Sequence, residues 1–244
     1  MKFAGILVLF AGYCLADSKL SYPPPRGNVK WWGTCSAGAG CKGPCDSSMA
    51  EVSAGKTISS DVVVSRDQEL TVKWGYASNR GGFVRVAMVP YSKSDSWCEF
   101  NNNVIKYSCY ESAGESIPTL QTDRWTTKIK IPLNMPDGVA TLQWVWYGGG
   151  NYYGNPNATF GEHYGCSDIK IEGGPFSNAK AAATFQGGDR LNPRSDVCEY
   201  HGSNKVGDCN FPNKYPNPIP GDLLSNSLEP CSIGPSKKGK PYRF

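Results

Sequence analysis

Histidines, cysteines and paired carboxylates are the residues of this chain that could carry chemistry. The only histidines are His163 and His201, and no two cysteines have the Cys-x2-Cys spacing of many structural zinc sites. We therefore predict no zinc site. Glu162 and Asp168 could form an acid/base couple, but a glycosidase needs two carboxylates roughly 5–10 Å apart across a sugar, which sequence spacing does not establish. Neither a Gly-x-Ser-x-Gly nucleophile elbow nor a phosphate-binding loop occurs.

The cysteine content indicates an exported protein. Ten cysteines occur in 244 residues, and nine of them follow Ala16. Residues 1–16 have the layout of a secretory signal peptide, with Lys2, an apolar run over 3–15 and small residues at the cleavage site. We expect the mature chain to begin at Asp17 and its cysteines to form disulfides. Because nine is odd, one thiol is left over, pairs with another molecule, or the cleavage site lies elsewhere.

Charge and hydropathy limit the possible partners. The net charge of +4 is too small to indicate a nucleic-acid partner, and the basic tail at 237–240 is typical of a solvated end. No later apolar run approaches the ~20 residues that cross a bilayer, so we expect no membrane contact after signal removal. Asn157 opens an Asn-Ala-Thr sequon, which predicts a glycosylated, exposed loop. We expect a secreted, extracellular monomer.

Alternating apolar and polar residues predict the strands that must position any site. The alternation runs through the segments 69–74, 83–89, 125–131, 139–147 and 168–172. A period of two places one face of a strand in a core and the other in water. Turn residues at 79–82, 136–138 and 148–150 separate the strands, and no stretch shows helical periodicity over three turns. The pattern predicts an all-β sandwich with long loops.

The chain changes character after Gly174. Alternation fades, and Pro, Gly, Asn, Ser and Lys dominate to the end, although Cys198, Cys209 and Cys231 lie there. We predict a β-sandwich over 17–174, followed by an irregular, disulfide-tied extension over 175–244 with a loose basic tail.

Two blocks of residues resemble a known family. The first is Ser-Tyr-Pro-Pro-Pro-Arg at 21–26, and the second joins Ala-Thr-Leu-Gln-Trp-Val-Trp at 140–146 to His-Tyr-Gly-Cys-Ser-Asp-Ile-Lys-Ile at 163–171. Together they resemble lytic polysaccharide monooxygenases and the related type-4 chitin-binding domains. Those proteins start with His-Gly, reach a Pro-x-x-Arg-like motif, and end their core with Leu-x-Trp and Cys-Ala-Asp-Ile-like strands. The resemblance covers about two thirds of the chain.

The resemblance implies an immunoglobulin- or fibronectin-III-like sandwich and a disulfide between Cys45 and Cys166. It also implies an insoluble polysaccharide, such as chitin or cellulose, as the ligand. Sequence proximity suggests two further pairs, which the resemblance does not cover. They are Cys98 with Cys109, and Cys198 with Cys209.

The chain departs from the family at the copper site. The family's enzymes hold copper with an N-terminal His and a second His, a donor set that suits this metal. By the resemblance, these positions fall on Asp17 and Arg80, and the axial aromatic position falls on His163. Arg stays protonated and cannot ligate a metal. We therefore expect no cofactor, and we hypothesise that Asp17 and Arg80 form an ion pair instead. Alternatively, both are ordinary surface charges.

Aromatic residues beside amides suggest sugar recognition, because rings cover the apolar face of a pyranose and amides bind its hydroxyls. The candidates are Trp31, Trp32, Tyr147, Tyr152 and Tyr153. The alternative is that these rings pack loops onto the sandwich. The strand residues Trp74, Trp144 and Trp146 are expected to lie in the core.

Three functions fit the sequence. The first is a non-catalytic, extracellular polysaccharide-binding protein. The second is a copper-dependent lytic polysaccharide monooxygenase with atypical ligands. The third is a structural protein of a wall or coat, in which the odd thiol forms cross-links.

Overall fold

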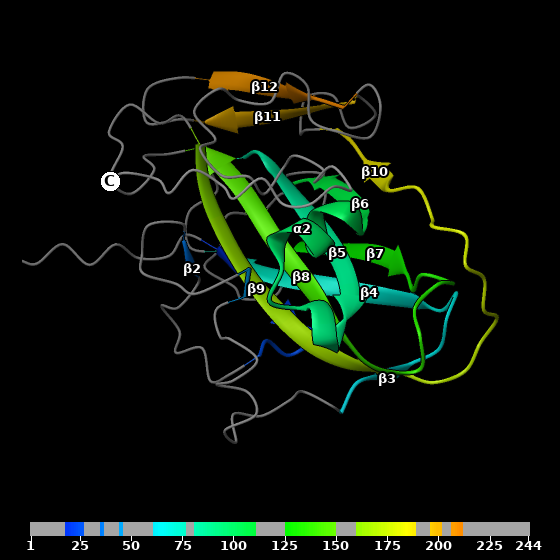
Figure 1. Ribbon diagram of the computed structural model, residues 1–244. Coiled ribbons are helices and arrows are strands. Elements are labelled where there is room, and N and C mark those ends of the chain that lie inside the picture. Colours follow the sequence, from blue (N-terminus) through cyan, green and yellow to red (C-terminus); the bar gives the residue numbers. More distant parts are fainter. Residues whose placement is uncertain are drawn as a thin grey trace, which may run out of the picture.

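Strands dominate the computed structural model, which describes residues 18–26, 35–36, 44–45, 61–76, 81–110, 125–149, 160–188, 196–201 and 206–211 (Figure 1). The strands are β1 (Ser18–Tyr22), β2 (Cys35–Ser36), β3 (Val63–Val64), β4 (Glu69–Tyr76), β5 (Phe83–Pro90), β6 (Val104–Cys109), β7 (Trp125–Lys130), β8 (Gly138–Gly149), β9 (Phe160–Ile171), β10 (Thr184–Gln186), β11 (Val197–His201) and β12 (Val206–Asn210). The helical elements are a 3-10 turn, η1 (Tyr91–Lys93), and α2 (Trp97–Asn102). In these ranges, no helix is long and apolar enough to span a membrane.

Two sheets pack face to face as an immunoglobulin-like sandwich, so the predicted fold class is confirmed. The smaller sheet has the order β1-β4-β7, and the larger has the order β10-β6-β5-β8-β9-β2, with β3 also paired to β9. In Figure 1, β4 and β7 lie behind β5, β8 and β9. The longest pairing joins β8 to β9 in antiparallel register, from Gly138 opposite Ile171 to Gly149 opposite Phe160.

Alternate side chains of both sheets fill the core between them. Trp74 on β4 packs against Trp144 on β8, with ring centroids 6.2 Å apart. Tyr110 lies between Trp74 and Trp146, with its ring centroid 5.1 Å from that of Trp146. The three tryptophans are at most 1% exposed, which confirms that they belong to the core.

The larger sheet is buried on its outer face as well, which alternation did not predict. On β5, Phe83, Ala87 and Val89 point away from the inter-sheet core, yet all are 0% exposed and belong to a second apolar cluster. Phe100 of α2 and Phe211, after β12, belong to the same cluster. The expectation that one face of each strand meets water is wrong for β5, because the helix and the extension cover that face.

In the extension after Gly174, β10 joins the larger sheet of the sandwich, whereas β11 and β12 form a sheet of their own. β10 pairs in parallel with β6, and β11 pairs with β12 as an antiparallel hairpin. Phe185 of β10 stacks on Phe211 with centroids 4.5 Å apart, so the two parts of the extension contact each other. The domain boundary at Gly174 stays a prediction.

Arg66 fastens the end of the sandwich where β8 starts and β9 stops. Its guanidinium donates to the Asp137 carboxylate at 2.7 Å and to the carbonyls of Met135 and Gly174 at 3.2 and 3.1 Å. The hydrogen bond from Arg66, followed by one from the backbone N–H of Gly173, holds the pKa of the Asp137 carboxyl below its ordinary value.

Replacing Asp137 by asparagine is expected to lower the unfolding temperature at neutral pH. Because the folded-state pKa lies below the ordinary value of 3.8, the carboxylate stabilises the fold above that pH, and the stabilisation is lost as pH falls through the folded pKa. The gap between wild type and Asp137→Asn should therefore close in acid. Thermal unfolding followed by circular dichroism across pH checks this, and a gap that stays constant in strong acid would contradict it.

Candidate functional site

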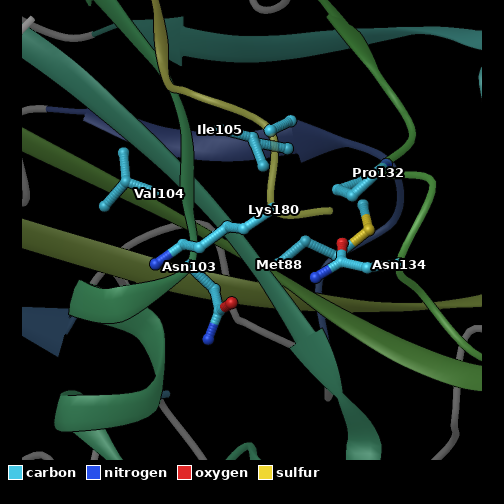
Figure 2. Close-up of a pocket in the computed structure, with 8 residues that line it drawn as sticks. Met88, Asn103, Val104, Ile105, Pro132, Asn134 and Lys180 are labelled. Carbon is cyan, nitrogen blue, oxygen red and sulfur yellow. The ribbon is translucent and has the colours of Figure 1, made fainter. Parts of the chain in front are cut away.

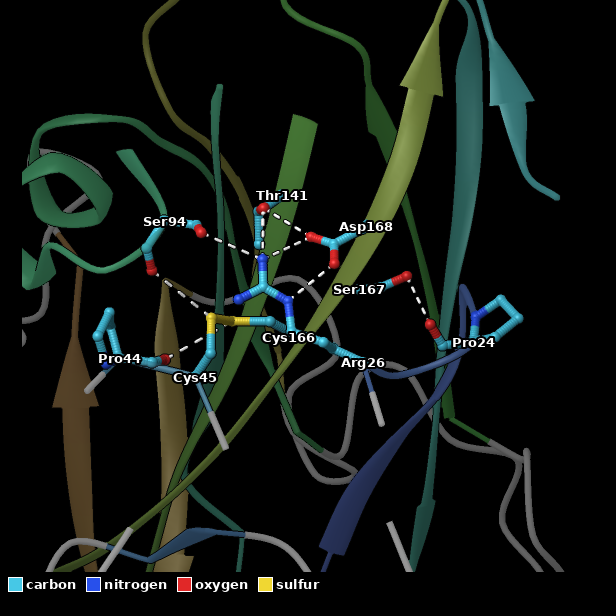
Figure 3. A network of polar contacts seen from close by, with 9 residues as sticks. All are labelled: Pro24, Arg26, Pro44, Cys45, Ser94, Thr141, Cys166, Ser167 and Asp168. Carbon is cyan, nitrogen blue, oxygen red and sulfur yellow. Dashed lines mark hydrogen bonds and ion pairs between the residues drawn. A yellow bond between two sulfur atoms is a disulfide. The ribbon is translucent and has the colours of Figure 1, made fainter. Parts of the chain in front are cut away.

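Arg26, at the end of the first family-like block, forms a buried ion pair with Asp168 of the second block (Figure 3). Its Nε donates to Asp168 Oδ2 at 2.8 Å, and its Nη2 donates to Oδ1 at 2.6 Å. Both side chains are 0% exposed. A two-point contact between a guanidinium and a carboxylate fixes orientation as well as distance. The segment after β1 is thereby fastened to the end of β9.

Two hydroxyl groups also contact this ion pair. Arg26 Nη2 also donates to Thr141 Oγ1 at 2.9 Å and to Ser94 Oγ at 3.1 Å, while Thr141 Oγ1 donates to Asp168 Oδ1 at 2.7 Å. A buried carboxylate engaged in this way is not the solvent-facing acid that a glycosidase pair needs. The structure therefore gives no support to an acid/base role for Asp168 with Glu162.

A disulfide lies beside the ion pair. Cys45 bonds to Cys166 with a Cα–Cα distance of 5.3 Å, which is the pairing that the resemblance implies. The Arg26 N–H donates to the Cys166 carbonyl at 2.6 Å, and Ser167 Oγ donates to the Pro24 carbonyl at 2.7 Å. One covalent bond and several hydrogen bonds thus join two segments of the N-terminal region to β9.

The two disulfides predicted from sequence proximity are wrong. Cys109 bonds to Cys198 across 89 residues, with a Cα–Cα distance of 5.0 Å, so the pairs Cys98–Cys109 and Cys198–Cys209 do not form. Cys98 is also disulfide-bonded. Cys209 lies opposite Cys198 in the hairpin register and is buried. Proximity failed because the hairpin packs on the outer face of the larger sheet, where Cys198 meets the end of β6.

The positions predicted to replace the copper brace are chain neighbours of residues at one end of the sandwich. This is the end where β8 stops and β9 starts, and we call it the β8–β9 end. It comprises the start of β1, the end of β4, Gly81 and Gly82, the end of β8 and the start of β9. Ser18 pairs with Tyr76 across β1 and β4. On the larger sheet, Trp146 pairs with His163, and Trp146 Nε1 donates to the Gly81 carbonyl at 2.9 Å.

Asp17 precedes Ser18 and Arg80 precedes Gly81, so each predicted brace position is a chain neighbour of a residue at the β8–β9 end. Asp17 and Arg80 themselves lie outside the described residues. The backbone of His163 belongs to β9. The Asp17–Arg80 ion pair stays a prediction.

Tyr147 is not a surface residue, which corrects its assignment as a sugar-binding ring. It is 0% exposed and stacks on Phe83 with centroids 4.8 Å apart. The second apolar cluster on the outer face of the sheet buries it. The other predicted sugar-binding residues and the glycosylation site lie outside the described residues. They are Trp31, Trp32, Tyr152, Tyr153 and Asn157.

The described residues do not fit a copper site. Within the ranges given above, no three His, Cys, Asp or Glu side chains gather in a way that could hold a metal ion. The sequence predicts Arg80 at one of the brace positions, and a protonated guanidinium has no lone pair to offer a metal. We therefore derive no chemical step through copper.

A pocket away from the β8–β9 end has no part in this site (Figure 2). It contains none of the predicted site residues, and its free space suits a water molecule rather than a sugar ring. It is lined by Met88, Asn103, Val104, Ile105, Pro132, Asn134, Lys180 and Ala181.

Sequence reasoning missed two structural roles at the site. Arg26 was considered only as a member of a motif, and Asp168 as a member of a motif and a possible acid/base partner of Glu162. Opposite charges in two separated motifs are nevertheless a usable signal for an ion pair. The bond from Trp146 to Gly81 had no signal, because an indole N–H gives no hint of its partner in sequence.

The chain is similar to known proteins in structure and not in sequence. No protein-family model matches the sequence, and no curated protein matches it. Solved structures of lytic polysaccharide monooxygenases are similar at low sequence identity. One, an AA15 enzyme from Thermobia domestica in the Cu(I) state, has a TM-score of 0.45 and 16% identity, over 63% of this chain and 98% of that chain.

Two further enzymes are similar over smaller shares. The cellulose-active enzyme CelS2, in complex with copper, has a TM-score of 0.34 and 15% identity, over 46% of this chain and 54% of its own. The extended catalytic domain of LPMO9A from H. jecorina has a TM-score of 0.32 and 13% identity, over 72% of this chain and 68% of its own. These scores are too low to support a conclusion about activity.

Proposed function

We propose that this protein is a secreted, non-catalytic polysaccharide-binding protein. The observation that supports this most directly is the ion pair between Arg26 and Asp168 beside the Cys45–Cys166 disulfide. Through it, the two blocks that carry the family resemblance meet in one buried unit. Such contacts between the N-terminal region and β9 are expected of a chain that folds its N-terminal segment onto the sandwich as the family does.

The lack of copper chemistry in the proposal rests on the donor set. The resemblance puts Asp17 and Arg80 where imidazoles would be, and copper favours nitrogen donors such as imidazole. One imidazole, from His163, is too few for a brace. The ligand class follows from the same resemblance, with a polysaccharide bound through exposed rings.

Depletion from solution by insoluble chitin and cellulose tests the binding. Mature wild type is expected to bind at least one polymer. A Trp31→Ala, Trp32→Ala, Tyr152→Ala, Tyr153→Ala variant should bind about tenfold more weakly, since aromatic contacts carry much of such binding energy. Phe176→Ala is the matched control, because Phe176 is 58% exposed and follows Gly174 at the opposite end of the sandwich.

Equal binding by a folded quadruple variant would reject the aromatic surface. No binding by wild type would reject the function. A copper titration of the same mature protein covers the oxygenase alternative: we expect no tight uptake, and stoichiometric sub-micromolar binding with oxidative chain cleavage would replace the proposal by that alternative.

A further inference from the structure

The nine residues 175–183, which we call the connecting segment, join the end of the sandwich to β10. Residues 178–182 are all exposed, and the segment contains neither a helix nor a strand. In Figure 1 it runs as an extended trace from beyond the end of β9 to β10, outside the strands that it passes. Exposed chain of this kind is the preferred site of proteolytic cleavage, because a peptide bond must be accessible to enter a protease.

The connecting segment is attached near its two ends. At its start, the Ser177 N–H donates to the Leu133 carbonyl at 3.1 Å, and just after it β10 pairs with β6. Between these points, the Ala179 N–H donates to Ser177 Oγ at 3.2 Å, a contact within the segment itself. Among the described residues, the backbone of 178–183 makes no hydrogen bond to either sheet, so a protease can engage it without opening the sandwich.

Lys180 is the only basic residue of the connecting segment. One alanine precedes it and three alanines follow it, and such small side chains fit narrow protease subsites. The lysine side chain lines the small pocket together with Asn103 and Asn134 (Figure 2). No ion pair within the described part of the chain holds it there. The side chain can therefore turn outward into the specificity pocket of a protease that cuts after lysine.

Lys128 provides a comparison within the same protein. Its side chain is 67% exposed, but its backbone lies in β7, where Lys128 pairs with Thr71 of β4. Cleavage after Lys128 requires β7 to leave the smaller sheet first. The two lysines are both exposed, so the difference between them is the freedom of the backbone.

A disulfide spans the connecting segment. Cys109 precedes the segment, Cys198 follows it, and the two are bonded. The chain after the segment is also held by the pairing of β10 with β6 and by the stacking of Phe185 on Phe211. A cut within the segment would therefore leave two pieces that stay joined, and the outer face of the larger sheet would stay covered.

We propose that the peptide bond between Lys180 and Ala181 is a processing site for a serine protease of trypsin-like specificity. Hydrolysis adds one water across this bond and leaves a carboxylate on Lys180 and an amine on Ala181. The product is a folded, two-chain protein whose chains are joined through Cys109 and Cys198. The inference goes beyond the proposed function and requires no polysaccharide ligand.

Limited digestion of the full mature protein with trypsin tests the site, with new chain ends quantified over time by mass spectrometry. The chain that begins at Ala181 is expected to form at least about 100-fold faster than cleavage after Lys128, because β7 must first open locally. Lys180→Gln should abolish this cut and leave the unfolding temperature unchanged. The chain that begins at Ala181 should separate from the rest only after reduction, and the cut protein should still unfold cooperatively.

Each outcome bears directly on the proposal. Cleavage after Lys180 that is no faster than cleavage after Lys128 would overturn the processing site. Separation of the two chains without a reductant would overturn the joined product, and loss of cooperative unfolding on cutting would overturn the folded one. These results are independent of polysaccharide binding, which the depletion experiment measures separately.

Discussion

Replacing Arg26 by methionine is expected to lower the free energy of unfolding by about 3–5 kcal/mol, because it leaves the Asp168 carboxylate buried without its cation. The two side chains are 0% exposed and make a two-point contact at 2.6 and 2.8 Å. Thr141 can still donate one hydrogen bond to Asp168, which is too little to replace the guanidinium. Denaturant unfolding of the full chain measures the loss.

A double-mutant cycle separates the ion pair from general packing. Asp168→Leu alone should cost a similar amount, since it leaves the guanidinium buried without its carboxylate. The double variant Arg26→Met, Asp168→Leu should cost clearly less than the sum, because an apolar pair leaves no buried charge. Additive losses would mean that the two charges do not depend on each other.

An exposed ion pair with a similar distance between its charged atoms provides the control. Lys128 Nζ lies 2.7 Å from Glu69 Oε1, but the two side chains are 67% and 53% exposed. Glu69→Gln is therefore expected to cost no more than about 1 kcal/mol. A loss at Arg26 as small as that at Glu69 would refute the view that burial makes this pair important.

Alternation of apolar and polar residues predicted the strands well, because every second side chain of a strand must be apolar to fill the core between the sheets. Leu70, Val72 and Trp74 recur at every second position, and all three are buried between the sheets. The same rule misplaced Tyr147. Its position on β8 puts it on the face opposite Trp146, and that face was assumed to meet water. It stacks on Phe83 in an apolar cluster that also contains Phe211 of the extension, and no local pattern encodes such a cover.

The disulfides likewise divide into one that motifs in the sequence identify and one that depends on contacts between distant segments. The resemblance identified Cys45–Cys166, because it joins two motifs at known positions. Nothing local to Cys109 or Cys198 indicates their pairing, which depends on how a hairpin from the extension packs across the larger sheet. A guess from proximity in sequence is weakest where a fold brings distant segments together.

The candidate site follows this pattern too. Counting along the motifs predicts Asp17 and Arg80 at the brace positions, and this stays a prediction because both lie outside the described residues. The count could use only motif order, so it could not find that Trp146 donates to the Gly81 carbonyl and that the Glu199 carbonyl accepts the Gly82 N–H. Those contacts depend on which strands become neighbours, and on the fold of the extension.

Replacing Gly82 by alanine is expected to lower the free energy of unfolding by about 2–5 kcal/mol. Two effects combine: Gly82 has a φ of +81°, which costs an L-residue roughly 1–2 kcal/mol, and its new methyl group would overlap the Tyr147 carbonyl.

Gly173→Ala tests the first effect alone, because its φ is +67° but nothing lies within 4 Å of the new methyl, so about 1–2 kcal/mol is expected. Gly165→Ala tests neither, since its nearest neighbour would be Leu20 Cβ at 3.9 Å, and it should be neutral or stabilising by up to about 1 kcal/mol. Denaturant unfolding should rank the losses Gly82, Gly173, Gly165. A Gly82→Ala variant no less stable than Gly173→Ala would show that the chain entering β5 can move away from Tyr147, and that the β8–β9 end is not rigid.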